Sequence, residues 1–300
     1  MADGMDTVER RLNSTRAQLE TLEKDLDGWT AGTAQECQSL STRMTLTLLD
    51  TLYSQILDEA FRDLSPNEEG WEIRRSILHT FLCTAEPTSA SLVADLLFTS
   101  DYTDVAEKLF SDLRAVLYRQ HGRVLACHKS FSDFIFDQSR SGIFWCNQAM
   151  HHRALADACF RCMKDGLRFN IANIPSSFVL DIDNHTLADA VKANIAPVLE
   201  YSCRNWSYHV CAAKSIIPDA LHDSISEFLQ LRALFWIETM NLLRLRSLCG
   251  SMLQTVHDWV MSSQASFLSF EYPVTDFPCH LGQLVISRRA SGGAIFCIIF

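Results

Sequence analysis

Cys127 and His128 are neighbours in this chain, and Asp133 lies about one helical turn beyond them. A cysteine beside a histidine is the pairing of a nucleophile and its general base. Adjacent residues of an extended segment point to opposite faces, so the thiol and the imidazole would be out of hydrogen-bond reach. We therefore expect no catalytic dyad here and no catalytic residue elsewhere in the chain.

Cys159 and Cys162 have the CxxC spacing of zinc and redox sites. A zinc site needs two further ligands at suitable spacing, and a redox motif belongs beside a βαβ unit. Both cysteines instead fall in an apolar helical pattern, which favours packing in a core. His151 and His152 open the same segment, but adjacent helical residues point about 100° apart and cannot share a metal ion. They are interpreted as surface histidines.

Other ligand-binding motifs are missing from the sequence. The aspartates of "DIDN" at 181–184 lack the glycine and distal glutamate of a calcium loop. No glycine is followed by lysine, so no phosphate-binding loop of the Walker A type is present. We expect no enzymatic activity, no bound metal and no cofactor held by this chain alone.

Composition narrows the class of protein further. The 300 residues are 48% hydrophobic and 21% charged, with a net charge of −10 that disfavours binding to a phosphate backbone. No apolar window approaches the roughly 20 residues of a membrane span. Eleven cysteines follow a polar N-terminus without a secretory signal. This pattern favours reduced thiols in a cytoplasmic protein.

Residues 45–140 carry the pattern of a winged helix. Four stretches with helical apolar spacing precede a hairpin signal at His121 and Gly122, and another helix follows. Pro66 ends the first stretch, and "EPTS" provides a Thr or Ser N-cap for the third. The apolar spacing of the fourth stretch predicts a helix that continues as far as Val116.

The flanking regions complete the predicted organisation. Residues 141–265 keep helical spacing throughout, so the expected fold class is mainly α, with a winged-helix domain followed by an all-helical domain. Residues 266–300 lose this period and are expected to form an irregular tail. Residues 1–44 predict a charged amphipathic helix and a linker, with a heptad stripe over 5–28. A solvated helix is favoured over a dimerising coil there.

The segment "VLACHKSFSDFIFD" resembles the His-x-Ser-Phe-x-(Asp/Glu)-Phe motif that closes the winged-helix domain of NACHT-type STAND proteins, the family of the NOD-like receptors. "LDTLYSQILDEAF" is similar to that family's entry into the winged helix. "DQSRSGIFWCNQAMHHRALADACFRCMKDGLRFNIANIPSS" and "PVLEYSCRNWSYHV" resemble the region that follows it in fungal NACHT proteins, where WD40 repeats often come next. The resemblance covers about residues 45–260.

The resemblance implies a role for His128. In the family, the histidine at this position faces the nucleotide of the NACHT domain and helps to keep the closed, ADP-bound state. An imidazole N–H can donate to a β-phosphate. This chain has neither Walker motif, so His128 would bind a cofactor only if another domain supplied the nucleotide. The resemblance also implies that the chain corresponds to the middle of a longer architecture, present as a short product, a truncated form or a degenerate relative.

Three functions follow as hypotheses. The first is a non-catalytic regulatory module that docks to a protein partner, either a NACHT-containing chain or a second copy through residues 5–28. The second is a nucleotide-dependent switch completed in trans by a NACHT domain. The third, nucleic-acid binding by the winged helix, is disfavoured by Asp104, Glu107 and Asp112 on the expected recognition helix.

Overall fold

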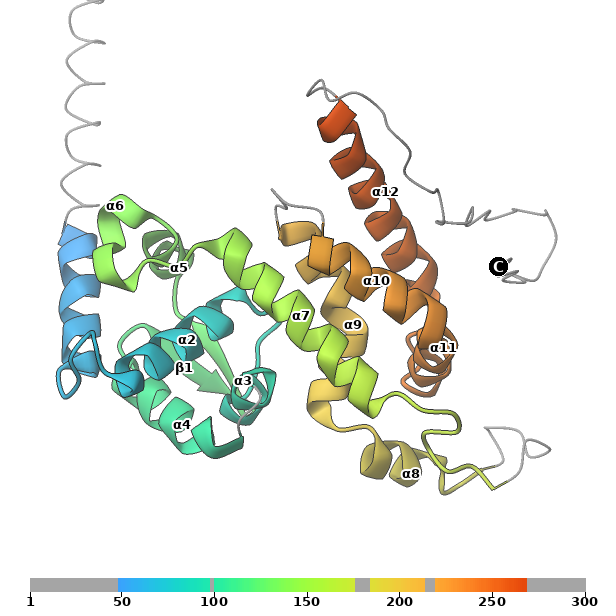
Figure 1. Cartoon of the computed structure of the whole chain (residues 1–300). Helices are drawn as coiled ribbons and strands as arrows, with labels where there is room; N and C mark the ends of the chain where they lie inside the picture. Colours follow the sequence, from blue (N-terminus) through green and yellow to red (C-terminus); the bar gives the residue numbers. More distant parts are fainter. Residues whose placement is uncertain (1–47, 98–99, 176–183, 214–218, 269–300) are drawn as a thin grey trace, which may run out of the picture. The chain divides into compact units, whose positions relative to one another are not determined.

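The computed structural model describes residues 48–97, 100–175, 184–213 and 219–268 (Figure 1). The described residues are mainly helical, with a short antiparallel hairpin after the first helices. The predicted fold class, a winged-helix arrangement followed by helices, is confirmed. The predictions for residues 1–44, including the stripe over 5–28, lie outside the described residues.

Helices precede the hairpin, as predicted. They are a helix over 48–61, α2 (Glu69–Cys83), α3 (Ala90–Leu96), the short η1 (Ser100–Tyr102) and α4 (Thr103–Asp112). Ser89 is the N-cap of α3, and its hydroxyl accepts from the Leu92 N–H at 3.2 Å. α4 ends at Asp112 rather than at Val116, because the buried Leu113 and Val116 lie in turns that lead into the hairpin.

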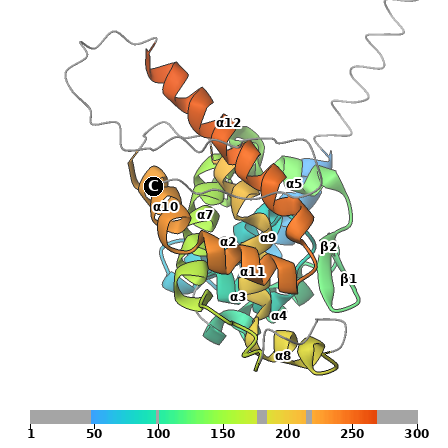
Figure 2. The same ribbon diagram turned by 90° about the vertical axis from the view of Figure 1, so that its right-hand side faces the viewer.

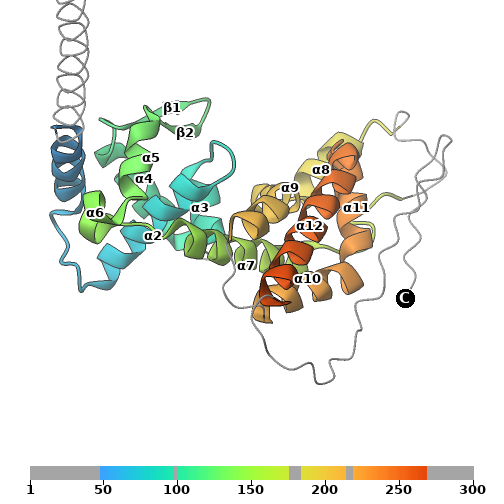
Figure 3. The same ribbon diagram turned by 90° about the horizontal axis from the view of Figure 1, so that it is seen from above.

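The hairpin joins β1 (Leu117–Gln120) to β2 (Arg123–Ala126) (Figure 3). His121 and Gly122 both have positive φ, 51° and 76°, as the two central residues of a type I′ turn require. Val124 N–H donates to the Thr88 carbonyl at 2.8 Å, so the segment before α3 extends the hairpin by one bridge. This backbone hydrogen bond thus links the hairpin to the segment before α3.

Helices follow the hairpin. α5 (Lys129–Ile135) buries Phe131, Phe134 and Ile135, which is the apolar stripe that the sequence predicts. The next elements are α6 (Gln138–Ser141), η2 (Gly142–Phe144), α7 (Gln148–Gly166), α8 (Leu187–Asn194), α9 (Pro197–Ala212), α10 (Asp219–Leu231), α11 (Ala233–Leu242), η3 (Arg246–Leu248) and α12 (Cys249–Leu268). α12 runs three residues into the predicted irregular tail, and 269–300 lie outside the described residues.

α7 is the central helix of this arrangement (Figure 1). It contacts α2 and α3 as well as α9 and α10, so contacts cross the predicted domain boundary at 140. Gly166 allows the closest approach: a Cβ atom there would lie 2.9 Å from Leu199 Cδ2 of α9. The described residues up to Val256 belong to one compact unit, and His257–Leu268 belong to a second.

The helices α7, α9, α10 and α11 are grouped together (Figure 2), and aromatic side chains from all four form a core between them. Trp206 of α9 lies against Phe160, Phe228 and Trp236, with ring centroids 4.9–5.9 Å apart. The Trp236 indole N–H donates to the Cys203 carbonyl at 2.9 Å. No described helix is long and apolar enough to cross a membrane.

Candidate functional site

His128 is the N-cap of α5 and is exposed. Its backbone is extended, with φ −149° and ψ 143°, and the preceding Cys127 is exposed as well. The imidazole Nδ1 accepts the backbone N–H of Ser130 at 3.1 Å. Histidine therefore serves here as a helix cap, a use that the sequence pattern did not reveal.

The cap fixes the protonation of the ring. Because a backbone N–H can only donate, Nδ1 must present a lone pair to Ser130, and the proton of the neutral imidazole is on Nε2. The Ser130 hydroxyl lies 2.7 Å from the same Nδ1 and 2.6 Å from the hydroxyl of the buried Tyr53. His128 is thus linked through Ser130 to the helix over 48–61, and its Nε2–H has no hydrogen-bond partner among the described residues.

Asp133 does not complete a catalytic triad in this geometry. Its carboxylate lies 3.9 Å from the Lys129 ammonium on the same exposed helical surface, while the His128 ring hydrogen-bonds to Ser130. The fold instead brings His128 and Ser130 together with Tyr53.

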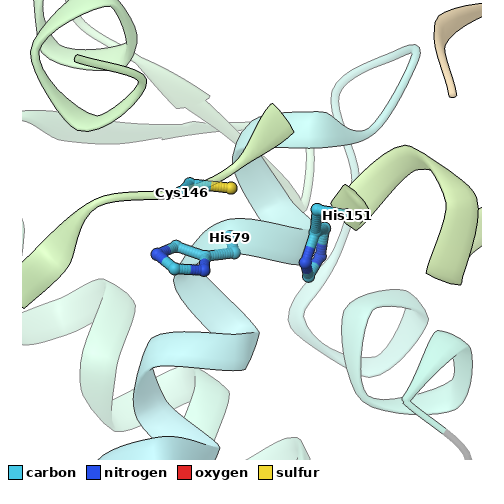
Figure 4. A group of neighbouring side chains, drawn as sticks. All are labelled: His79, Cys146 and His151. Atoms are coloured by element: carbon cyan, nitrogen blue, oxygen red, sulfur yellow. The ribbon is translucent and has the colours of Figure 1, made fainter. Parts of the chain in front are cut away.

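A second group of reactive side chains lies between α2 and the start of α7. One nitrogen each of His79 and His151 and the sulfur of Cys146 lie within 4.8 Å of one another (Figure 4). The two imidazole rings meet edge to face, with centroids 5.7 Å apart. His79 and Cys146 are buried, and His151 is partly exposed. No sequence motif pointed to this group.

Hydrogen bonds orient both imidazoles. His79 Nε2 lies 3.0 Å from the Phe144 carbonyl, which can only accept, so Nε2 carries the proton and the lone pair is on Nδ1. His151 Nε2 lies 3.0 Å from the hydroxyl of the buried Thr80. Burial, with repulsion from His79 and His152, lowers the pKa of His151 to about 3. Its ring is therefore neutral near pH 7.

Cys83 adjoins the group from the last turn of α2. Its thiol donates a hydrogen bond to the Cys146 sulfur, and this bond lowers the pKa of Cys146 to about 6, with smaller contributions from His79 and Arg75. The same bond and burial raise the pKa of Cys83. The hydrogen bond thus favours the thiolate form at Cys146 over that at Cys83.

The surface interpretation of the histidine pair is wrong for His152, which is buried. Its Nδ1 lies 3.0 Å from Nδ1 of His209, and His209 Nε2 lies 2.8 Å from the Tyr201 hydroxyl. The Ala85 N–H donates to that hydroxyl at 3.1 Å. A Tyr201 hydroxyl that donates to His209 Nε2 leaves the proton of the neutral His209 ring on Nδ1, from which it donates to His152.

The CxxC cysteines both lie within α7. Cys159 is fully buried, and burial raises the pKa of its thiol to about 12. Cys162 is partly exposed, and burial raises its pKa too. Core packing, the favoured interpretation of this motif, holds for Cys159.

Comparison of the chain with protein-family models, with curated proteins and with solved structures finds no match.

Proposed function

We propose that this chain is a non-catalytic regulatory module of a NACHT-type STAND signalling protein and acts by docking to a NACHT-containing chain. One observation carries the docking proposal. The helix over 48–61 presents Leu48, Leu52 and Ile56 at intervals of four residues, with Leu48 71% and Leu52 48% exposed. Side chains at this spacing lie on one face of a helix.

This apolar stripe borders a cavity. Leu52 and Ile56 line a space of about 570 Å³ together with Lys108, Asp112 and Arg114 from the end of α4 and the turn after it. An apolar stripe with charged residues at its rim is the arrangement of a binding patch for an amphipathic helix or a domain surface. The stripe is part of "LDTLYSQILDEAF", one of the segments that carry the family resemblance.

A binding measurement tests the docking proposal. The double variant Leu48→Ser and Leu52→Ser should weaken association with a purified NACHT-containing homologue about 10-fold or more, because buried apolar anchors dominate interface energies. Phe169→Ser is the matched control, since Phe169 is 80% exposed and lies after α7, away from the stripe. Equal affinities of the two variants and the wild type would refute docking through the stripe.

A second function, a nucleotide switch completed in trans, is favoured by the state of His128. Its Nε2–H is an exposed donor whose tautomer is fixed by the cap on Ser130. This is the form of imidazole that can donate to a phosphate oxygen held by another chain.

Substitution of His128 by asparagine separates its two roles, which are to cap α5 and to donate a hydrogen bond to the nucleotide. His128→Asn keeps an acceptor for the Ser130 N–H, so the stability of α5 should change by only a few tenths of a kcal/mol. ADP-dependent association with a NACHT chain should weaken about 10-fold, since a hydrogen bond to a charged group contributes roughly 1.5–3 kcal/mol. Calorimetry measures both the stability of the variant and its ADP-dependent association with the NACHT chain. Identical heats for the variant and the wild type would exclude contact between His128 and the nucleotide.

A further inference from the structure

Three potential metal ligands, His79, Cys146 and His151, converge where α2 meets the start of α7, and Cys83 lies outside this group beside Cys146. His79 and Cys83 are four residues apart on α2, and therefore lie on the same face of that helix. Cys146 and His151 come from the segment after η2 and from the first turn of α7 (Figure 4). The group is separate from the apolar stripe and from His128.

We propose that His79, Cys83, Cys146 and His151 bind one zinc ion. Two imidazoles and two thiols are the Cys₂His₂ donor set of structural zinc sites. The donors of a tetrahedral zinc site lie about 3.3–3.8 Å apart, given zinc bonds of about 2.0 Å to nitrogen and 2.3 Å to sulfur. Donor atoms of His79, Cys146 and His151 within 4.8 Å of one another need only a small contraction to reach that geometry.

The surrounding hydrogen bonds suit this use. A metal-binding histidine usually donates its second ring N–H to a carbonyl or another acceptor, which holds the ring and its tautomer in place. His79 does so to the Phe144 carbonyl, and His151 has Thr80 at the corresponding distance. Each imidazole therefore has its other nitrogen, Nδ1, for the metal.

The charge and the soft character of these four ligands favour zinc over calcium and magnesium. Zinc binds neutral imidazoles and thiolates, and the four residues offer two imidazoles and two thiols. On binding, the thiols would lose their protons to solvent, and the two thiolates would balance the charge of Zn²⁺. The group contains no carboxylate, so it lacks the hard oxygen ligands that calcium and magnesium require.

The ion has a route to the site. His151 is partly exposed, and a cavity of about 420 Å³ is lined by Cys146, Asn147 and His152 at the start of α7. Once bound, zinc would link α2 to α7, the helices that pack against each other across the predicted boundary.

Metal titration of the whole chain tests the proposal. The reduced chain, stripped with a chelator, should take up one Zn²⁺ per chain, and Co²⁺ should give the visible bands of a tetrahedral site with a thiolate-to-cobalt charge-transfer band. Cys146→Ser should weaken zinc binding about 100-fold or more and diminish the charge-transfer band. His151→Gln, at a partly exposed position, should weaken binding while keeping that band.

The controls separate a site from incidental thiol binding. Cys127→Ser removes an exposed thiol outside the group and should bind zinc as the wild type does. Thr80→Val, which removes the partner of His151, should weaken binding roughly 10-fold. No zinc uptake by the reduced chain, or equal affinity in Cys146→Ser and Cys127→Ser, would overturn the proposal. A Cys83–Cys146 disulfide that persists with zinc in excess would overturn it too.

Discussion

Replacing Trp206 by alanine should lower the free energy of unfolding by about 3–5 kcal/mol, the usual cost of deleting a large buried aromatic side chain. Trp206 is fully buried and is in contact with three aromatic rings, those of Phe160, Phe228 and Trp236. These rings come from α7, α10 and α11, so the cavity left by alanine would loosen the packing of three helices on α9. Urea unfolding followed by circular dichroism measures the loss.

Two variants define how that result should be interpreted. Among the described residues, the indole Nε1 of Trp206 has no hydrogen-bond partner. Trp206→Phe removes this buried donor and keeps an aromatic ring, so it should cost much less than alanine. Phe169→Ala, at a side chain 80% exposed, should change stability by about 0.5 kcal/mol or less. A Trp206→Ala variant as stable as Phe169→Ala would contradict the central role of this cluster.

Acid should unfold the chain through His209. Burial, together with repulsion from His152 and His151, lowers the pKa of His209 from 6.5 to about 3. Between these values the unfolded chain binds a proton that the native chain does not, so stability falls as the pH decreases. Well below pH 6.5 one such group costs about 1.4 kcal/mol per pH unit, and the loss between pH 6.5 and 4.5 is about 2.3 kcal/mol because the unfolded imidazole is only half protonated at pH 6.5. Burial lowers the pKa of His152 as well, which steepens the loss.

His209→Gln isolates this contribution. The variant cannot take up the proton, so its free energy of unfolding should decline more gently between pH 6.5 and 4.5 than that of the wild type. Urea titrations at several pH values, with a chelator present throughout, measure the two slopes. Parallel slopes would show that His209 already carries a proton in the native state.

The hairpin and the helices around it could be predicted because their signals are local. His121-Gly122 supplies two residues that tolerate positive φ, and the turn forms at that pair. Phe131, Phe134 and Ile135 are spaced for one helical face, and all three are buried. The end of α4 was misplaced because Leu113 and Val116 continue the apolar spacing after the helix has stopped. Buried turns carry the same apolar pattern as a buried helix.

The histidine and cysteine group could not be predicted, because its members are distant in sequence and each belongs to an ordinary helical or loop pattern. His79 and Cys83, four residues apart on a predicted helix, were the only local signal, and that spacing is common by chance. Their partners Cys146 and His151 are defined by how α7 packs on α2. His152 was misjudged for a related reason: it is buried by α9, whose His209 provides its hydrogen bond.

The position of α7 has a consequence for how the molecule opens. Since this helix contacts α2 on one side of the predicted boundary and α9 on the other, neither group of helices can separate without exposing it. Amide hydrogens in α2, α7 and α9 should then exchange with solvent deuterium through one shared opening event rather than two independent ones. Any partner that holds one part closed would slow exchange in the other.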